Sequence, residues 1–213
     1  MKTDDVISFL AANAGPTRRP RAEGRFGLAT ALGGVAAALM AALIFGIRPD
    51  IAGIAGTPLF WAKVAFPAVL AALALCIAAR LSRPGLSAGA WWLMLAVPIL
   101  ILWIAAAMSV AQAPASERLA LVMGTSWRDC PFNILLLSVP AFIATCRAMK
   151  SLAPTHLRAA GAAAGLLSGA TATVAYCLHC PEMSVAFWAV WYVAGMAAPA
   201  ILGAVFGPRL LAW

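Results

Sequence analysis

Charged side chains are scarce in this chain. They account for 10% of its 213 residues, whereas hydrophobic residues account for 64%. A soluble domain is about a quarter charged and about half apolar. Together with a mean hydropathy of +0.94, these proportions exclude an ordinary soluble enzyme, a disordered tail and a secreted disulfide scaffold. They predict an all-α, polytopic membrane protein whose partner along most of its length is the lipid bilayer.

Ionisable groups are almost missing from the apolar runs themselves. Lys63 alone lies clearly inside a run, close to one end, where we expect its ammonium group to snorkel to water. A proton or ion pathway normally needs carboxylates or histidines at mid-membrane depth, and the runs contain none. This lack argues against an ion-coupled transporter and against an intramembrane protease.

The apolar residues form six runs, and a helix needs roughly 20 residues to cross the bilayer core. The runs lie at about residues 26–46, 59–79, 89–110, 132–150, 158–178 and 184–206. The alternation of a β-barrel is absent, so the sequence predicts six transmembrane helices with short loops. We divide the chain into an N-terminal partner-binding segment (1–25), a transmembrane domain (26–207) and a tail (208–213).

Small and aromatic residues within these runs predict how the helices pack. Gly161, Gly165 and Gly169 recur every four residues, which lets a neighbouring backbone approach closely. Trp188, Trp191 and Tyr192 share one face of the last run, and we interpret them as packing residues. Prolines inside four of the runs are expected to kink their helices: Pro67, Pro98, Pro140 and Pro199.

The positive charges predict the orientation. Six helices put both termini on one side, and eleven lysines and arginines fall on that side. Three fall on the other side: Arg48, Arg118 and Arg128. Because cytoplasmic loops carry the excess of positive charge, we place both termini in the cytoplasm and the chain in a bacterial inner membrane. We therefore attribute the net charge of +8 to the orientation of the chain in the membrane rather than to direct binding of nucleic acid.

Three of the five cysteines gather on the predicted outer side. Cys130 opens the fourth run, and Cys177 and Cys180 end the fifth, beside His179 and Glu182. One interpretation is a structural disulfide between Cys130 and Cys180, because the periplasm is oxidising. A second is a redox or metal sensor, since thiolate, imidazole and carboxylate suit a soft or borderline divalent metal bound transiently. A third is that these are free thiols without a shared role.

The N-terminal segment is the other candidate site. Thr3 can cap a short helix, Asp4 and Asp5 suit its first turn, and Gly15-Pro16 stops it. Its apolar side chains are Val6, Ile7, Phe9 and Leu10. A helix of this length is marginal in water, so we expect it to order on a partner or, alternatively, to lie on the membrane surface or fray.

A basic run follows this helix. The residues Arg18-Arg19-Pro20-Arg21 are interpreted as a tether to lipid headgroups.

Several motifs together resemble those of the NrsF-type integral-membrane anti-sigma factors. The likeness extends over nearly the whole chain, and the most specific part is the element His179-Cys180-Pro181-Glu182. The other matching segments are Met1-Lys2-Thr3-Asp4-Asp5-Val6-Ile7, Arg48-Pro49-Asp50, Trp127…Cys130, Ala153-Pro154-Thr155, Tyr176 and Trp191-Tyr192.

The resemblance implies a negative regulator that holds an extracytoplasmic-function (ECF) sigma factor at the inner membrane. It implies release under heavy-metal or oxidative stress, with no cofactor required, and cysteines at two outer positions matched here by Cys130 and Cys180. Cys177 is not part of that pattern. Two alternatives remain open, a membrane thiol–disulfide oxidoreductase using Cys177 and Cys180, and a small transporter.

Overall fold

The computed structural model describes residues 3–13, 22–83 and 85–212. Within these ranges the chain is helical and contains no strand, which confirms the all-α class. The elements are α1 (Thr3–Asn13), α2 (Ala22–Met40), the π-helical turn η1 (Ala41–Phe45), α3 (Ile51–Ile54), α4 (Pro58–Leu81), α5 (Trp91–Gln112), α6 (Arg118–Met123), α7 (Asp129–Lys150), α8 (Leu157–Tyr176), α9 (Val185–Phe187), the π-helical turn η2 (Trp188–Tyr192) and α10 (Val193–Leu210).

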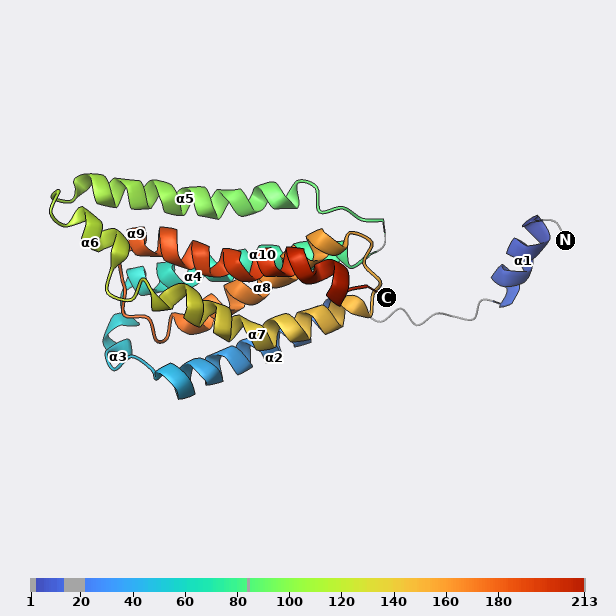
Figure 1. Ribbon diagram of the computed structural model, residues 1–213, viewed down its shortest axis with the longest axis horizontal. Helices are drawn as coiled ribbons and strands as arrows, with labels where there is room; N and C mark the ends of the chain where they lie inside the picture. Colours follow the sequence, from blue (N-terminus) through green and yellow to red (C-terminus); the bar gives the residue numbers. More distant parts are fainter. Residues whose placement is uncertain (1–2, 14–21, 84, 213) are drawn as a thin grey trace.

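The long helices run alongside one another in an elongated bundle (Figure 1). The short helices α3, α6 and α9 lie at one end, which we call the α3/α6 end. The start of α2 and the end of α10 lie at the opposite end, which we call the C-terminal end. Helix α1 has no buried residue and is drawn apart from the bundle in Figure 1.

Five helical stretches within the described residues are long and apolar enough to cross a membrane. They are Phe26–Phe45, Pro58–Leu81, Trp91–Gln112, Asp129–Lys150 and Val185–Leu210. The sequence predicted six, and the difference is α8, whose 20 residues are rich in alanine and glycine rather than in large apolar side chains. The physical reason lies in its position, because α8 packs against α2, α4, α7 and α10 and most of its residues are buried against protein.

The glycine stripe of α8 makes the closest helix contact of the bundle. A Cβ atom added to Gly161 would meet the Gly203 carbonyl of α10, and one added to Gly165 would meet the Pro199 carbonyl. At Gly169 the added atom would lie 2.7 Å from the Pro199 ring. The stripe therefore serves helix packing, as its spacing predicted.

Helix α5 lies on the outside of the bundle, where it packs against α4 and α9 (Figure 1). One hydrogen bond ties it to the last long helix: Trp103 Nε1 donates to the Ala189 carbonyl oxygen at 3.0 Å. Ala189 belongs to η2, and a π-helical turn disturbs the regular pairing of helix carbonyls. An irregular turn near the start of the last helix thus provides the acceptor that anchors the outermost helix.

Some boundaries differ from those expected. The connections before α4 and before α7 are not bare loops, because they contain α3 and α6. The last helix continues to Leu210 instead of ending near residue 207. The stop at Gly15-Pro16 and the basic run Arg18-Arg19-Pro20-Arg21 lie outside the described residues.

Replacing Gly165 with alanine tests the α8–α10 contact. Because the new Cβ would overlap the Pro199 carbonyl, we expect Gly165→Ala to destabilise the bundle by about 1–3 kcal/mol, measured as a lower thermal unfolding temperature in detergent. The matched control is Gly27→Ala in α2, where an added Cβ meets nothing within 4 Å. Equal unfolding temperatures for Gly165→Ala and the wild type would contradict this packing.

Candidate functional site

The residues that link α8 to α9, Cys177 to Ser184, form a loop at the α3/α6 end of the bundle, which we call the α8–α9 loop. A loop inside a membrane protein cannot satisfy its backbone carbonyls by helix pairing, so side chains must supply the donors. Three consecutive carbonyls of this loop, those of Cys180, Pro181 and Glu182, accept hydrogen bonds from side chains, and the donors come from three other parts of the chain.

Lys63 of α4 is the central donor. Its side chain is fully buried, with 0% exposed, and Nζ donates to the carbonyl oxygens of Cys180 at 2.7 Å and Glu182 at 2.8 Å. The ring of Tyr192 lies 5.9 Å from Nζ, within cation–π range. The expectation that Lys63 snorkels to water is therefore wrong, because the loop folds over its ammonium group and replaces water with carbonyl oxygens.

Arg48 holds the loop from the other side. Its Nη1 donates to the carbonyls of Cys180 at 3.0 Å and Pro181 at 3.3 Å, and its backbone N–H donates to Leu178 O at 3.2 Å. The guanidinium also pairs with Asp50 through two hydrogen bonds of 2.7 Å. This pairing lowers the pKa of Asp50 and raises that of Arg48, so both side chains keep their charges at neutral pH. We call Lys63 and Arg48, the two cations that hold the loop carbonyls, the loop clamp.

Glu182 connects the loop to the segment that precedes α7. Its carboxylate accepts hydrogen bonds from the backbone N–H of Thr125 at 2.7 Å and of Ser126 at 3.3 Å, and from the Thr125 hydroxyl at 2.7 Å. Ser184 donates to the Leu121 carbonyl at 2.7 Å. The α8–α9 loop is therefore bonded to both other connections at the α3/α6 end, the one between η1 and α4 and the one between α5 and α7.

Two tryptophans of η2 reinforce this arrangement. Trp188 Nε1 donates to the Glu182 carbonyl at 3.1 Å, and Trp191 Nε1 donates to the Val122 carbonyl at 2.9 Å. Trp191 also packs against Trp127, with ring centroids 5.3 Å apart. The packing role predicted for these aromatic residues is confirmed, and their indole N–H groups add hydrogen bonds that the sequence did not suggest.

Of the three cysteines of the predicted sensor, Cys177 and Cys180 are in the α8–α9 loop and Cys130 is in the first turn of α7. Cys130, Cys177 and Cys180 are each 0% exposed, and all are free thiols. Cys130 belongs to the same buried core as Cys177 and Cys180, because α7 packs against α8. The Cys177 Sγ lies 3.8 Å from the Lys63 carbonyl oxygen and 3.9 Å from the Tyr192 hydroxyl. The structure thus brings the thiols together but shields them from water.

The proposed metal ligands do not converge in this conformation. His179 Nδ1 bonds to the Gly46 carbonyl at 3.0 Å, and the Glu182 carboxylate faces Thr125 and Ser126. In the part of the chain that the structure describes, no three His, Cys, Asp or Glu side chains are placed to hold one metal ion. A site built from Cys130, Cys180, His179 and Glu182 stays a prediction, and it requires the loop to rearrange.

The N-terminal candidate site is a helix, as predicted. Helix α1 has the acidic residues Asp4 and Asp5 in its first turn. Ile7, Phe9 and Leu10 are 60%, 66% and 62% exposed, respectively. Val6 is half-buried. Large apolar side chains are thus displayed on a short helix without burial in the bundle.

Sequence reasoning missed Lys63 and Arg48 as residues of this site. Both were visible as unusual features, because Lys63 lies inside an apolar run and Arg48 lies on the side that is poor in positive charge. A cation at such a position needs a local partner. The sequence gives no sign that the partners are the carbonyls of a loop more than a hundred residues away.

Replacing Lys63 with methionine tests the clamp. The change removes the charged donor from the carbonyls of Cys180 and Glu182, which keep only their hydrogen bonds from Arg48 and Trp188, at a cost of about 1–3 kcal/mol. We expect the loop to open more often, so that a water-soluble maleimide modifies Cys180 roughly 5- to 150-fold faster. The control is Lys150→Met, an exposed lysine of α7. If Cys180 stays as unreactive in Lys63→Met as in the wild type, Lys63 does not hold the loop closed.

Comparison with known proteins gives this geometry a context. Residues 10–213 match the family described as "NrsF: Negative regulator of sigma F". The chain is 44% identical to the probable anti-sigma-F factor NrsF of Azospira oryzae over 213 residues, which cover all of both chains. It is 37% identical to the anti-sigma-F factor NrsF of Caulobacter vibrioides over 214 residues, again covering both chains completely.

No solved structure matches the chain. The curated relatives are regulators rather than enzymes, which agrees with the expectation of a non-enzyme and supports a sigma factor as the partner. The family match covers nearly all of the chain, including every residue of the clamp. The chain therefore belongs to the NrsF family of negative regulators of a sigma factor.

Proposed function

We propose that the chain is an inner-membrane anti-sigma factor that binds an ECF sigma factor through α1 and releases it when Cys130 of α7 and Cys180 of the α8–α9 loop react with a metal ion or an oxidant. The observation that carries the proposal is the full-length likeness to anti-sigma-F factors. Sequestration and sensing are assigned to opposite ends of the molecule.

The partner-binding role of α1 is supported by its exposed apolar residues. Phe9 and Leu10 are each more than three-fifths exposed, although a short helix gains little stability from its own hydrogen bonds. Burial against a protein partner supplies the missing stabilisation. Asp4 and Asp5 stabilise the start of this helix through the helix dipole, so they keep it ready for binding.

The orientation is supported by the positions of the cations in the bundle. Arg80, Arg83, Arg147, Lys150 and Arg158 are near the helix ends that connect at the C-terminal end. The α3/α6 end carries fewer cations, and two of these are used by the loop clamp. The positive-inside rule then places the C-terminal end in the cytoplasm, with α8 as the sixth crossing shielded from lipid by its neighbours.

The sensing step must begin with movement of the α8–α9 loop. Cys130 and Cys180 are fully buried, so a dissolved ion reaches them only when the hydrogen bonds of Lys63, Arg48 and Glu182 to this region open. A metal or a disulfide that joins the two thiols then holds the loop in a rearranged state. His179 and Glu182 become available as further ligands only after they leave Gly46 and Thr125.

The energies of such a switch are sufficient. Moving a two-state equilibrium from 1:99 to 99:1 takes about 5.5 kcal/mol. Apparent binding free energies of about 10–16 kcal/mol are known for structural zinc sites at neutral pH. A thiolate site that supplies roughly a third to a half of this free energy is enough to drive the change.

Replacing Phe9 with alanine tests the partner-binding role of α1. Removing a buried aromatic anchor from an interface commonly costs more than about 1.4 kcal/mol, which is a tenfold loss of affinity. We expect Phe9→Ala to reduce co-purification of the sigma factor from membranes about tenfold or more, with equal amounts of membrane protein. Ser8→Ala, an exposed polar neighbour, is the control. Undiminished capture by Phe9→Ala would place the binding surface elsewhere.

Serine substitutions at the two cysteines test the sensing role. We expect Cys130→Ser and Cys180→Ser to abolish the induction of sigma-dependent transcription by cadmium or by a thiol oxidant. The controls are Cys76→Ser and Cys146→Ser, which change cysteines outside the loop region. Cys177→Ser in the same assay measures the role of the third thiol. An unchanged response in both principal variants leaves Cys130 and Cys180 structural.

A further inference from the structure

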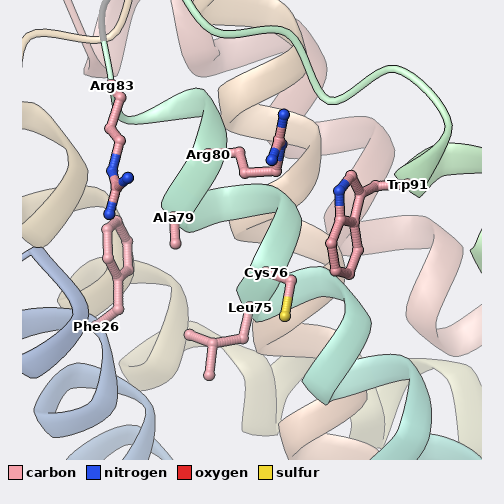
Figure 2. A pocket seen from close by; sticks show the side chains of 7 residues that line it. All are labelled: Phe26, Leu75, Cys76, Ala79, Arg80, Arg83 and Trp91. Atoms are coloured by element: carbon pink, nitrogen blue, oxygen red, sulfur yellow. The ribbon is translucent and has the colours of Figure 1, made fainter.

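A pocket of about 380 Å³ lies at the C-terminal end of the bundle, where α2, α4 and the start of α5 meet (Figure 2). Its apolar wall is formed by Phe26, Leu75, Ala79 and Trp91. Arg80 and Arg83 line the same pocket. Figure 2 shows the Arg83 side chain extending toward the ring of Phe26 and Arg80 lying between α4 and Trp91.

The position of this pocket is that of a membrane surface. Arg80 is in the last turn of the apolar helix α4, which ends at Leu81, and Trp91 begins the apolar helix α5. Both arginines are exposed. Arginine and tryptophan at the ends of spans lie at the level of the lipid headgroups. The pocket is thus cationic where headgroups lie and apolar where the acyl region begins.

A separate apolar hollow lies further along the same two helices. A second pocket of about 480 Å³ lies between α4 and α5 and includes Phe66 and Val69 of α4 and Val97 and Ile101 of α5. Val69 is six residues from Leu75, which is about 9 Å along the helix axis. The seam between α4 and α5 is therefore apolar, and its hollow lies beyond Val69 toward the α3/α6 end, where it includes Leu59 and Trp188.

We propose that this site binds an anionic phospholipid, with the phosphodiester on Arg80 and Arg83 and one acyl chain in the α4–α5 seam. The guanidinium group matches the oxygens of a phosphate, and basic pockets between membrane helices bind acidic lipid headgroups. The site is distinct from the α8–α9 loop, which lies at the opposite end of the bundle. The lipid joins α5, the outermost helix, to α4.

Other occupants fit less well. The basic run Arg18-Arg19-Pro20-Arg21 of this chain carries the same charge as the pocket, so electrostatic repulsion opposes its entry. A soluble acidic peptide matches the arginines but leaves the seam below them empty. A phospholipid fits both the arginines and the apolar seam, because its charged headgroup is joined directly to its apolar acyl chains.

Cys76 provides a reporter within the protein itself, since it lines the pocket and its thiol is exposed. The full-length protein is placed in nanodiscs of phosphatidylcholine alone or with phosphatidylglycerol, and the rate of Cys76 modification by a small maleimide is measured by peptide mass spectrometry. We expect phosphatidylglycerol to slow the reaction. Native mass spectrometry of the detergent-purified protein is expected to show retained phosphatidylglycerol.

The arginine variants distinguish a specific site from a lipid-coated surface. Each arginine near an anionic surface is worth about 1 kcal/mol, so Arg80→Gln together with Arg83→Gln is expected to weaken phosphatidylglycerol binding about 30-fold. In this double variant the Cys76 rate should no longer depend on lipid composition. Arg118→Gln, at the α3/α6 end, is the control and should behave like the wild type.

Three results would overturn the proposal. The first is equal retention of phosphatidylglycerol by the wild type and the double variant. The second is a Cys76 rate that is the same in both nanodiscs. The third is protection of Cys76 by inorganic phosphate in the absence of anionic lipid, which would identify a free anion as the ligand. Removal of residues 1–14 should leave the protection unchanged, and a loss would identify α1 as the occupant.

Discussion

The hydrogen bonds from the Lys63 ammonium group to the carbonyls of Cys180 and Glu182 are the contact on which the α3/α6 end depends. An ammonium group has three donors and loses its hydration when it is buried, so it must find acceptors within the protein. The α8–α9 loop has carbonyls that no helix satisfies. The ammonium group therefore supplies the donors that the loop carbonyls lack, and the carbonyls supply the acceptors that the buried ammonium group needs. The fold of the loop and the burial of the cation stabilise one another.

This mutual dependence orders the loop without an ion pair. The described residues place no carboxylate within ion-pair distance of Lys63, so the interaction is weaker than a hydrogen-bonded ion pair. Arg48 and Glu182 add contacts from two other connections. The backbone of Cys180 and the thiol of Cys177, both in the loop, contact Lys63 directly.

Helix α8 is the element that connects the two ends of the molecule. It begins at Leu157 at the C-terminal end and leads directly into the loop, and its glycines bring it into backbone contact with α10. Such contacts have little space for side-chain adjustment, so a displacement at one end is passed to the neighbouring backbone rather than absorbed. The same tight packing explains why α8 is built from small residues instead of large apolar ones.

Much of the architecture could be predicted because it follows from local pattern. Six apolar runs were predicted to span the membrane, and five of them are helices long and apolar enough to do so. The four-residue spacing of Gly161, Gly165 and Gly169 predicted a close helix contact, and the acidic start after Thr3 predicted α1. The gathering of Cys130, Cys177 and Cys180 also followed from topology, because the ends of antiparallel helices meet.

The amino-acid sequence by itself determined the class of the protein, the positions of the long helices and the family, since hydropathy, spacing and motif are properties of neighbouring residues. Only the tertiary structure decided that Lys63 is buried instead of reaching water, that the cysteines are shielded, and that His179 and Glu182 face away from a shared site. The reason is physical: the acceptors that bury a cation come from a distant loop, and no local pattern specifies which carbonyls will meet it.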